Sequence, residues 1–160
     1  MKVRRLFFSL ALAALAALAL AGAASAARLD GADHGGRLLS TVLTGEQEVD
    51  PVTGVIGVGD PDGSGTATIT INPGQEEVCW EIRAKDITLP AAAAHIHEGP
   101  AGIAGPVVVG LTPPDASGFS SGCATLEREE AVEILKNPED YYVNVHTSDF
   151  PNGAIRGQLS

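Results

Sequence analysis

The sequence predicts an all-β domain: a Greek-key β-sandwich of about eight strands with one short helix near residues 127–136. Short apolar runs recur along most of the chain, and glycine, proline and aspartate separate them. Within several runs apolar and polar side chains alternate, which is the period of a strand with one buried face. Many short strands joined by Gly- and Pro-rich turns are typical of sandwiches and Greek-key barrels.

The clearest strands form a predicted hairpin. Residues 66–72 and residues 78–85 both alternate between apolar and polar side chains, and the turn sequence Asn72-Pro73-Gly74-Gln75 lies between them. This pattern indicates two antiparallel strands that share one buried face. The apolar positions of the pair are Ala67, Ile69, Ile71, Val78, Trp80, Ile82 and Ala84.

Six further runs are predicted as strands, and one segment as a helix. The strand segments are 38–43, 93–97, 106–111, 120–125, 141–147 and 154–159. Residues 127–136 instead carry apolar side chains at helical spacing, with acidic residues first and Lys136 last, as the helix dipole favours. Asn137-Pro138 then ends the helix.

The first 26 residues have the three parts of a cleaved signal peptide. A basic start with Arg4-Arg5 precedes an apolar run over residues 6–20, and Ala24-Ser25-Ala26 forms an A-x-A cleavage site. A retained anchor, the alternative, needs about 20 apolar residues. We therefore expect a secreted or periplasmic protein with no membrane anchor after cleavage. The paired arginines leave both the general secretory route and the twin-arginine route open.

The remaining chain divides into a flexible leader, residues 27–37, and one domain, residues 38–160. Cleavage would leave seven basic residues against twenty acidic ones, a net charge of −13. Such a charge argues against nucleic acid and anionic membrane surfaces as partners. Cys79 and Cys123 are the only cysteines. An even pair in an exported chain predicts a disulfide, with two buried thiols as the alternative.

Three of the four histidines are candidates for a metal site. His95 and His97 are two residues apart on a predicted strand, so both imidazoles point to one face while Ile96 points to the core. His146 shares the polar face of another strand with Asn144. Three imidazoles on neighbouring strands suit copper or zinc, and copper(II) binds more tightly. The alternative is a surface histidine pair and a structural His146.

Two further features belong to this candidate site. Glu98 and Asn144 are candidates to orient a ligand imidazole from behind. The Gly-rich residues 99–105 neither open a helix nor include a lysine, so they predict a loop rather than a phosphate cradle. Their glycines would let the backbone pass close to the histidines.

Two motifs resemble the CHRD (chordin) domain family. The first runs from His95-Ile96-His97-Glu98 through Val109, and the second covers residues 142–147 and 150–159. With residues 43–49, the resemblance spans roughly residues 40–160. It implies an extracytoplasmic all-β domain. In chordin itself the domain is a module of a secreted protein that binds growth factors, which makes an extracellular protein a candidate partner.

The segment His95-Ile96-His97-Glu98 also resembles the strand that supplies two copper ligands in copper/zinc superoxide dismutases. In this resemblance His146 takes the place of a third ligand and Arg156 that of the arginine that guides anions. The chain lacks a histidine for the copper–zinc bridge and a His/Asp zinc cluster between His97 and His146. A zinc site of that kind is therefore not expected, and the acidic chain would repel superoxide.

The fold expectation is accordingly a superoxide-dismutase-like or immunoglobulin-like sandwich. The leading functional hypothesis is an exported binding protein that holds a copper-type metal ion through His95, His97 and His146. A metal-free extracellular protein-interaction module is the first alternative. A superoxide-dismutase-like redox enzyme is the second, and only there would Arg156 have a catalytic role.

Overall fold

The computed structural model describes residues 35–160. The predicted signal peptide, most of the predicted leader and His34 lie outside this part of the chain. Within the described residues, no helix is long and apolar enough to cross a membrane.

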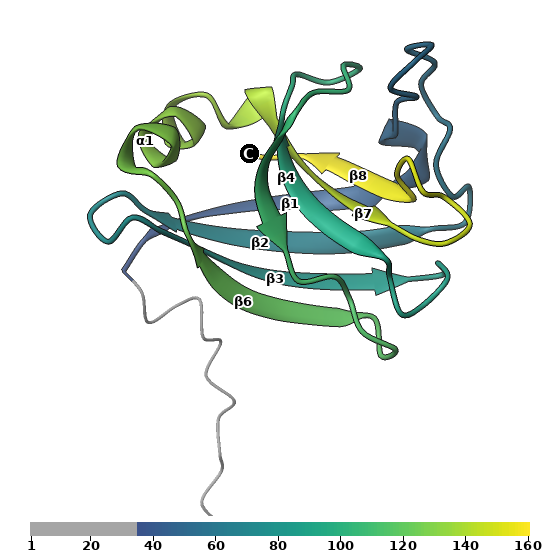
Figure 1. The fold of residues 1–160 in the computed structure, drawn as a ribbon, viewed down its shortest axis with the longest axis horizontal. Coiled ribbons are helices and arrows are strands. Elements are labelled where there is room, and N and C mark those ends of the chain that lie inside the picture. The colour runs from purple at the N-terminus through teal and green to yellow at the C-terminus, as the bar shows by residue number, and fades with distance from the viewer. Residues whose placement is uncertain (1–34) are drawn as a thin grey trace, which may run out of the picture.

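Eight antiparallel strands form one sheet in the order β5-β4-β7-β8-β1-β2-β3-β6. The strands are β1 Arg37–Thr44, β2 Ser64–Asn72, β3 Glu77–Lys85, β4 Ala93–Glu98, β5 Val107–Leu111, β6 Phe119–Thr125, β7 Tyr141–His146 and β8 Ile155–Gln158. β1 and β8 are paired only at Thr44 and Arg156, and the sheet folds over there into two four-stranded layers (Figure 1). The predicted all-β sandwich and its strand count are confirmed.

The core lies between the two layers and follows from the alternation in the strands. In the β2–β3 hairpin Ile69 pairs with Trp80, and both side chains are buried. From the other layer Ile96 and Val143, a second directly opposed pair, are fully buried in the same cluster. Each strand thus gives every second side chain to one shared core.

One helix, α1 (Arg128–Lys136), closes the end of the molecule at which the β2–β3 turn lies (Figure 1). Its Ala131 and Ile134 are fully buried in the core, which confirms the helical spacing seen in the sequence. The amide of Leu126, just before the helix, donates to the carbonyl of Glu76 in that turn. Two short 3-10 helices, η2 (Gly45–Gln47) and η3 (Pro138–Asp140), were not predicted.

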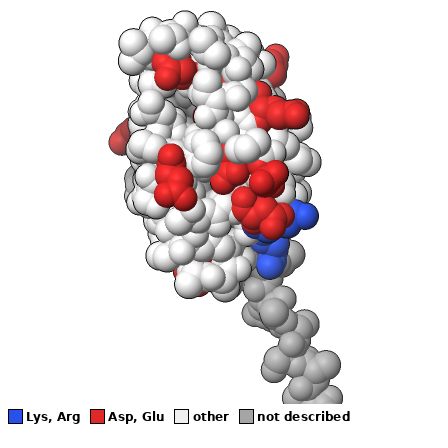
Figure 2. Space-filling model, turned by 90° about the vertical axis from the view of Figure 1, so that its right-hand side faces the viewer, with Lys and Arg blue, Asp and Glu red and all other residues white. Residues whose placement is uncertain are grey.

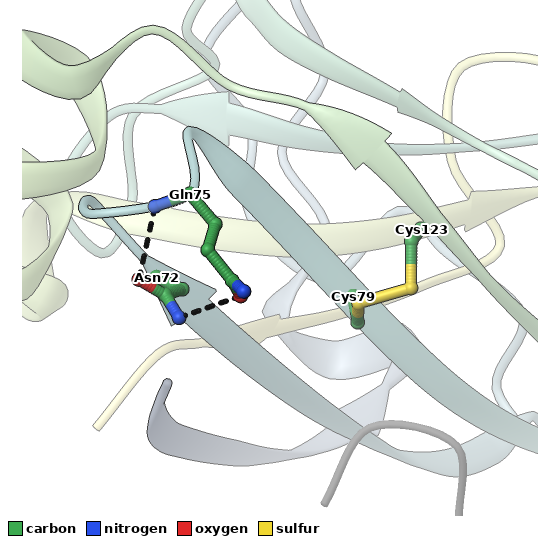
Figure 3. Close-up of a disulfide and its surroundings, with 4 residues drawn as sticks. All are labelled: Asn72, Gln75, Cys79 and Cys123. Atoms are coloured by element: carbon green, nitrogen blue, oxygen red, sulfur yellow. Dashed lines mark hydrogen bonds between the residues drawn. A yellow bond between two sulfur atoms is a disulfide. The ribbon is translucent and has the colours of Figure 1, made fainter. Parts of the chain in front are cut away.

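The predicted disulfide is present, and it joins two neighbouring strands. Cys79 of β3 and Cys123 of β6 are directly opposed, and the bridge lies on the outer side of their layer, since the adjacent Trp80 faces the core. Figure 3 shows it near the β2–β3 turn, where the Asn72 side chain accepts a hydrogen bond from the Gln75 amide. Outside residues 1–34, the chain has no free cysteine.

Removing this bridge should destabilise the fold. A Cys79→Ala/Cys123→Ala variant opens a loop with a sequence separation of 44, which the chain-entropy model values at about 4 kcal/mol of unfolding free energy. Urea unfolding monitored by Trp80 fluorescence measures the change. Ser121→Ala, an exposed change on the same face of β6, should have almost no effect. A loss below about 1 kcal/mol in the double variant would show that the bridge contributes little.

Candidate metal centre

The register between β4 and β7 brings the three predicted histidines together. His97 lies opposite Tyr142, His95 opposite Asn144, and Ala93 opposite His146. Directly opposed residues share a face of the sheet, so all three imidazoles project from the outer face of this layer. Ile96, between the two histidines of β4, is fully buried in the core, as the sequence predicted.

The ring nitrogens converge. His95 Nδ1 lies 3.1 Å from His146 Nε2, and the centroids of these two rings are 5.0 Å apart. One nitrogen from each of the three rings lies within 4.8 Å of the others. Imidazole nitrogens about 2 Å from one shared ion lie about 3–4 Å apart, so small ring rotations would bring the set to that geometry.

Two backbone carbonyls determine which nitrogens carry protons. His97 Nδ1 lies 2.9 Å from the carbonyl oxygen of Gly105, and His146 Nδ1 lies 3.0 Å from that of Pro151. A carbonyl oxygen only accepts, so each Nδ1 carries the hydrogen and donates it. In a neutral ring Nε2 then carries the lone pair that can bind a metal, which is how second-shell groups orient metal-binding histidines.

Burial keeps these rings neutral. It lowers the pKa of His95, His97 and His146 alike, and for His95 the neighbouring imidazoles lower the pKa further. In His97 and His146 the carbonyl partners act in the opposite direction, but burial outweighs them. At neutral pH the cluster thus offers lone pairs rather than positive charges, which is the state in which imidazole binds metals.

The His97 ring also has a buried nitrogen without a partner. His97 is 8% exposed, and its Nε2 makes no hydrogen bond to any described residue. Buried polar atoms almost always have partners, so an unpaired acceptor of this kind needs an explanation. A metal ion on Nε2 would satisfy it, and the site therefore fits a metal that accepts three imidazoles. A second group, Glu77 with Cys79 and Cys123, has both sulfurs in the disulfide and offers no thiolate.

The two predicted orienting residues differ in position. Asn144 is buried among the imidazoles, with Oδ1 3.1 Å from His146 Nε2. Glu98 is exposed, and within residues 35–160 no hydrogen bond joins its side chain to an imidazole. The groups that hold the rings are the carbonyls of Gly105 and Pro151, which sequence patterns do not reveal.

Arg156 anchors the Gly-rich loop that covers this face. It is 1% exposed, and its guanidinium donates to the carbonyls of Ile103 and Pro100. The same group lies 3.3 Å from the centroid of the Tyr142 ring, whose other neighbour is His97, stacked at 4.8 Å. These contacts occupy Arg156 with structure, which leaves it poorly placed to meet an anion from solvent.

The loop passes as close to the strand as its glycines allow. A Cβ at Gly105 would collide with the carbonyl of Glu98. The Gly105 amide donates to the hydroxyl of Tyr142 while its carbonyl accepts from His97. The predicted close approach of this segment to the histidines is confirmed. Tyr142, for which the sequence indicated no role at the site, stacks on a candidate ligand.

Glu48 is the buried charged residue that the sequence did not indicate. It is almost fully buried, its Oε1 has no partner among the described residues, and its carboxyl group packs against the backbone of Gly153. Burial raises the pKa of Glu48 to about 8, even though the positive charge of Arg156 acts to lower it. Gly153 belongs to the 147–154 loop that also supplies the Pro151 carbonyl to His146.

Comparison with known proteins identifies one family. The family model described as the CHRD domain matches residues 39–159. No curated protein matches the chain.

The hydrogen bonds to Gly105 and Pro151 predict a specific tautomer. In the metal-free protein at neutral pH, His97 and His146 should both carry their hydrogen on Nδ1. Long-range proton–nitrogen correlation spectra distinguish the two ring nitrogens, and acidification, which protonates both, provides the reference. Hydrogens on Nε2 in both rings would show that the carbonyls do not orient them.

The position of Glu48 predicts a loss of stability at alkaline pH. Its folded pKa of about 8 lies above the ordinary value of 4.5 for a glutamate, so the stability linked to its proton is complete below 4.5 and is lost as pH rises through 8. Between about pH 7 and pH 9 the unfolding free energy should fall by about 1 kcal/mol. Glu48→Gln should remove this dependence, and Glu46→Gln, an exposed control in the same loop, should retain it. Parallel urea-midpoint profiles for the wild type and Glu48→Gln would contradict the assignment.

Proposed function

We propose that this chain, which belongs to the CHRD domain family, is an exported binding protein that holds one copper ion through His95, His97 and His146. The observation that carries the proposal is the unpaired, buried Nε2 of His97 beside two further imidazoles whose nitrogens converge with it. The Nδ1 hydrogen bonds of His97 and His146 leave Nε2 of each ring as the nitrogen that can bind the ion.

The donor set favours copper(II) over other ions. Imidazole suits copper and zinc, and copper(II) stands above zinc in intrinsic affinity for nitrogen sites. The only methionine of the chain is Met1, and Cys79 and Cys123 are bonded to each other, so soft sulfur ligands for copper(I) are not offered by this domain. When bound, the ion would supply one-electron redox chemistry. The chain's own residues orient its ligands through Gly105, Pro151 and Asn144.

Export is part of the proposal. Residues 1–26 have the pattern of a signal peptide, and the Cys79–Cys123 disulfide is of the kind that persists in oxidising compartments. We therefore place the mature domain outside the cytoplasm, secreted or periplasmic.

A dismutase activity receives less support than metal binding. Arg156, the residue that would guide superoxide, is buried and hydrogen-bonded to the loop over residues 99–106. The acidic chain adds a repulsive field for an anionic substrate. Metal binding requires neither an arginine that guides anions nor access for superoxide. The proposed binding function therefore does not depend on dismutase activity.

The proposal predicts copper uptake with a defined stoichiometry. Purified metal-free protein should take up about one copper(II) per chain by native mass spectrometry, and copper should displace zinc. His97→Ala should abolish tight uptake, because it removes the most buried of the three ligands. In excess copper, at about 100 times Kd, binding should add about 2.7 kcal/mol to the unfolding free energy of the wild type.

The fourth histidine provides the matched control. His34→Ala removes the one histidine that is not among the three proposed ligands and should leave uptake at about one ion per chain. If wild type takes up no copper, or if His34→Ala and His97→Ala reduce uptake equally, the three-histidine site is not a copper centre. The metal-free interaction module would then be the better description of the domain.

A further inference from the structure

The connection between β1 and β2 is far longer than the strands require. Thr44 and Ser64 are directly paired, so a turn of about 2–5 residues would join them. The chain instead runs through residues 45–63 and projects from one end of the molecule (Figure 1). Long excursions of this kind within compact domains are usually functional.

The tip of this excursion is a rigid small hairpin. Val49 and Ile56 form a β-bridge, and the Asp50 amide donates to the carbonyl of Val55 at 2.8 Å. The Asp50 carboxylate accepts from the amides of Val52 and Thr53 and from the Thr53 hydroxyl. At the base Gly45 and Asp60 pack so closely that a Cβ on Gly45 would collide with the Asp60 backbone. The backbone of the tip is therefore held in place by several contacts, which sets where its side chains leave the chain.

The fixed tip presents aliphatic side chains to solvent. Val52 is 89% exposed and Ile56 59% exposed, and the Gly-rich loop next to them adds Ile103 at 54%. The two loops touch, because a Cβ at Gly102 would lie 3.4 Å from Ile56 Cδ1. We call this surface the end patch; its members are Val52, Val55, Ile56, Val58 and Ile103. Five such side chains expose a few hundred Å², roughly the size of the largest and often functional patch of a monomer.

The surroundings of the end patch are acidic. Residues 45–63 include Glu46, Asp50, Asp60 and Asp62 and contain no lysine or arginine. The Gly-rich loop, residues 99–106, has no charged residue at all. Figure 2 looks onto the side toward which the 45–63 excursion projects in Figure 1: carboxylates are scattered among uncharged groups from the top to the lower part of this face, and basic groups appear only near its lower right edge. A partner that covers an apolar centre with an acidic rim should carry basic residues opposite that rim.

We propose that the end patch is a docking surface for a protein partner that presents an apolar pocket with a basic rim. A protein interface typically has such a rigid apolar centre and a polar rim, and preorganisation lowers the entropy cost of binding. The proposal is independent of the metal centre, since the end patch includes none of its histidines.

A partner protein fits this surface better than a membrane or a second copy does. Interfacial membrane anchors combine Trp, Phe or Leu with Lys and Arg, whereas the end patch has no aromatic and no basic residue, and its acidic rim would be repelled by anionic lipid. In a symmetric dimer the acidic rims of two copies would face each other, and like charges across an interface cost several kcal/mol.

Selection from a library of random displayed peptides tests the proposal on purified protein. Selected peptides should combine aliphatic or aromatic residues with lysine or arginine. For the best synthetic peptide, Ile56→Glu should weaken binding at least about tenfold, as expected for the centre of an interface. Val42→Glu, at another exposed aliphatic residue on β1, should leave binding unchanged. Salt at about 0.5 M should weaken binding, because it screens the rim charges.

Three results would overturn the proposal, provided that thermal unfolding shows Ile56→Glu to be folded. In the first, no peptide is selected, or the selected peptides bind wild type and Ile56→Glu equally. In the second, the protein cosediments with phosphatidylcholine vesicles and Ile56→Glu does not, which makes the end patch a membrane surface. In the third, sedimentation velocity shows a dimer that Ile56→Glu dissociates, which makes it a self-association surface.

Discussion

Strand β4 is hydrogen-bonded on both sides, to β5 and to β7, and this double pairing fixes where the imidazoles lie. The register sets His95 against Asn144 and His97 against Tyr142, with His146 one pair further along. A slip of one residue would turn both β4 histidines into the core and Ile96 out of it. The apolar packing of Ile96 and Val143 therefore stabilises the same register that assembles the site.

The outer face of this layer is a second buried region rather than a solvated surface. Arg156 and Tyr142 hold the 99–106 loop against it, and Glu48 packs beneath the loop that orients His146. These contacts exclude water from one side of the cluster and lower the pKa of all three imidazoles through burial. Arg156 thus contributes to the centre by holding its cover in place, a role that differs from guiding an anion.

The sequence predicted the strands, the helix and the disulfide because each leaves a local signal. Alternation marks residues 66–72, helical spacing marks residues 127–136, and the paired cysteines of an export-type chain mark the bridge. The spacing of His95 and His97 likewise predicts a shared face.

The sequence could not predict the contacts between segments that are distant in the chain. The histidine partners at Gly105 and Pro151 are backbone carbonyls, which no residue type indicates. The burial of Glu48 depends on the contact between two loops that lie far apart in the sequence. The sequence also did not predict the apolar tip at residues 52–58, because the exposure of aliphatic side chains in a turn-rich segment leaves no local signal.

We propose that three imidazoles from two paired strands share one copper ion. X-ray absorption spectroscopy of the copper-loaded protein tests it most directly, because multiple scattering from imidazole rings reports how many histidines bind. If the three histidines bind together, the spectrum should show three imidazole nitrogens at about 2 Å from the copper. A spectrum with one imidazole or none, and with oxygen ligands in their place, would contradict it.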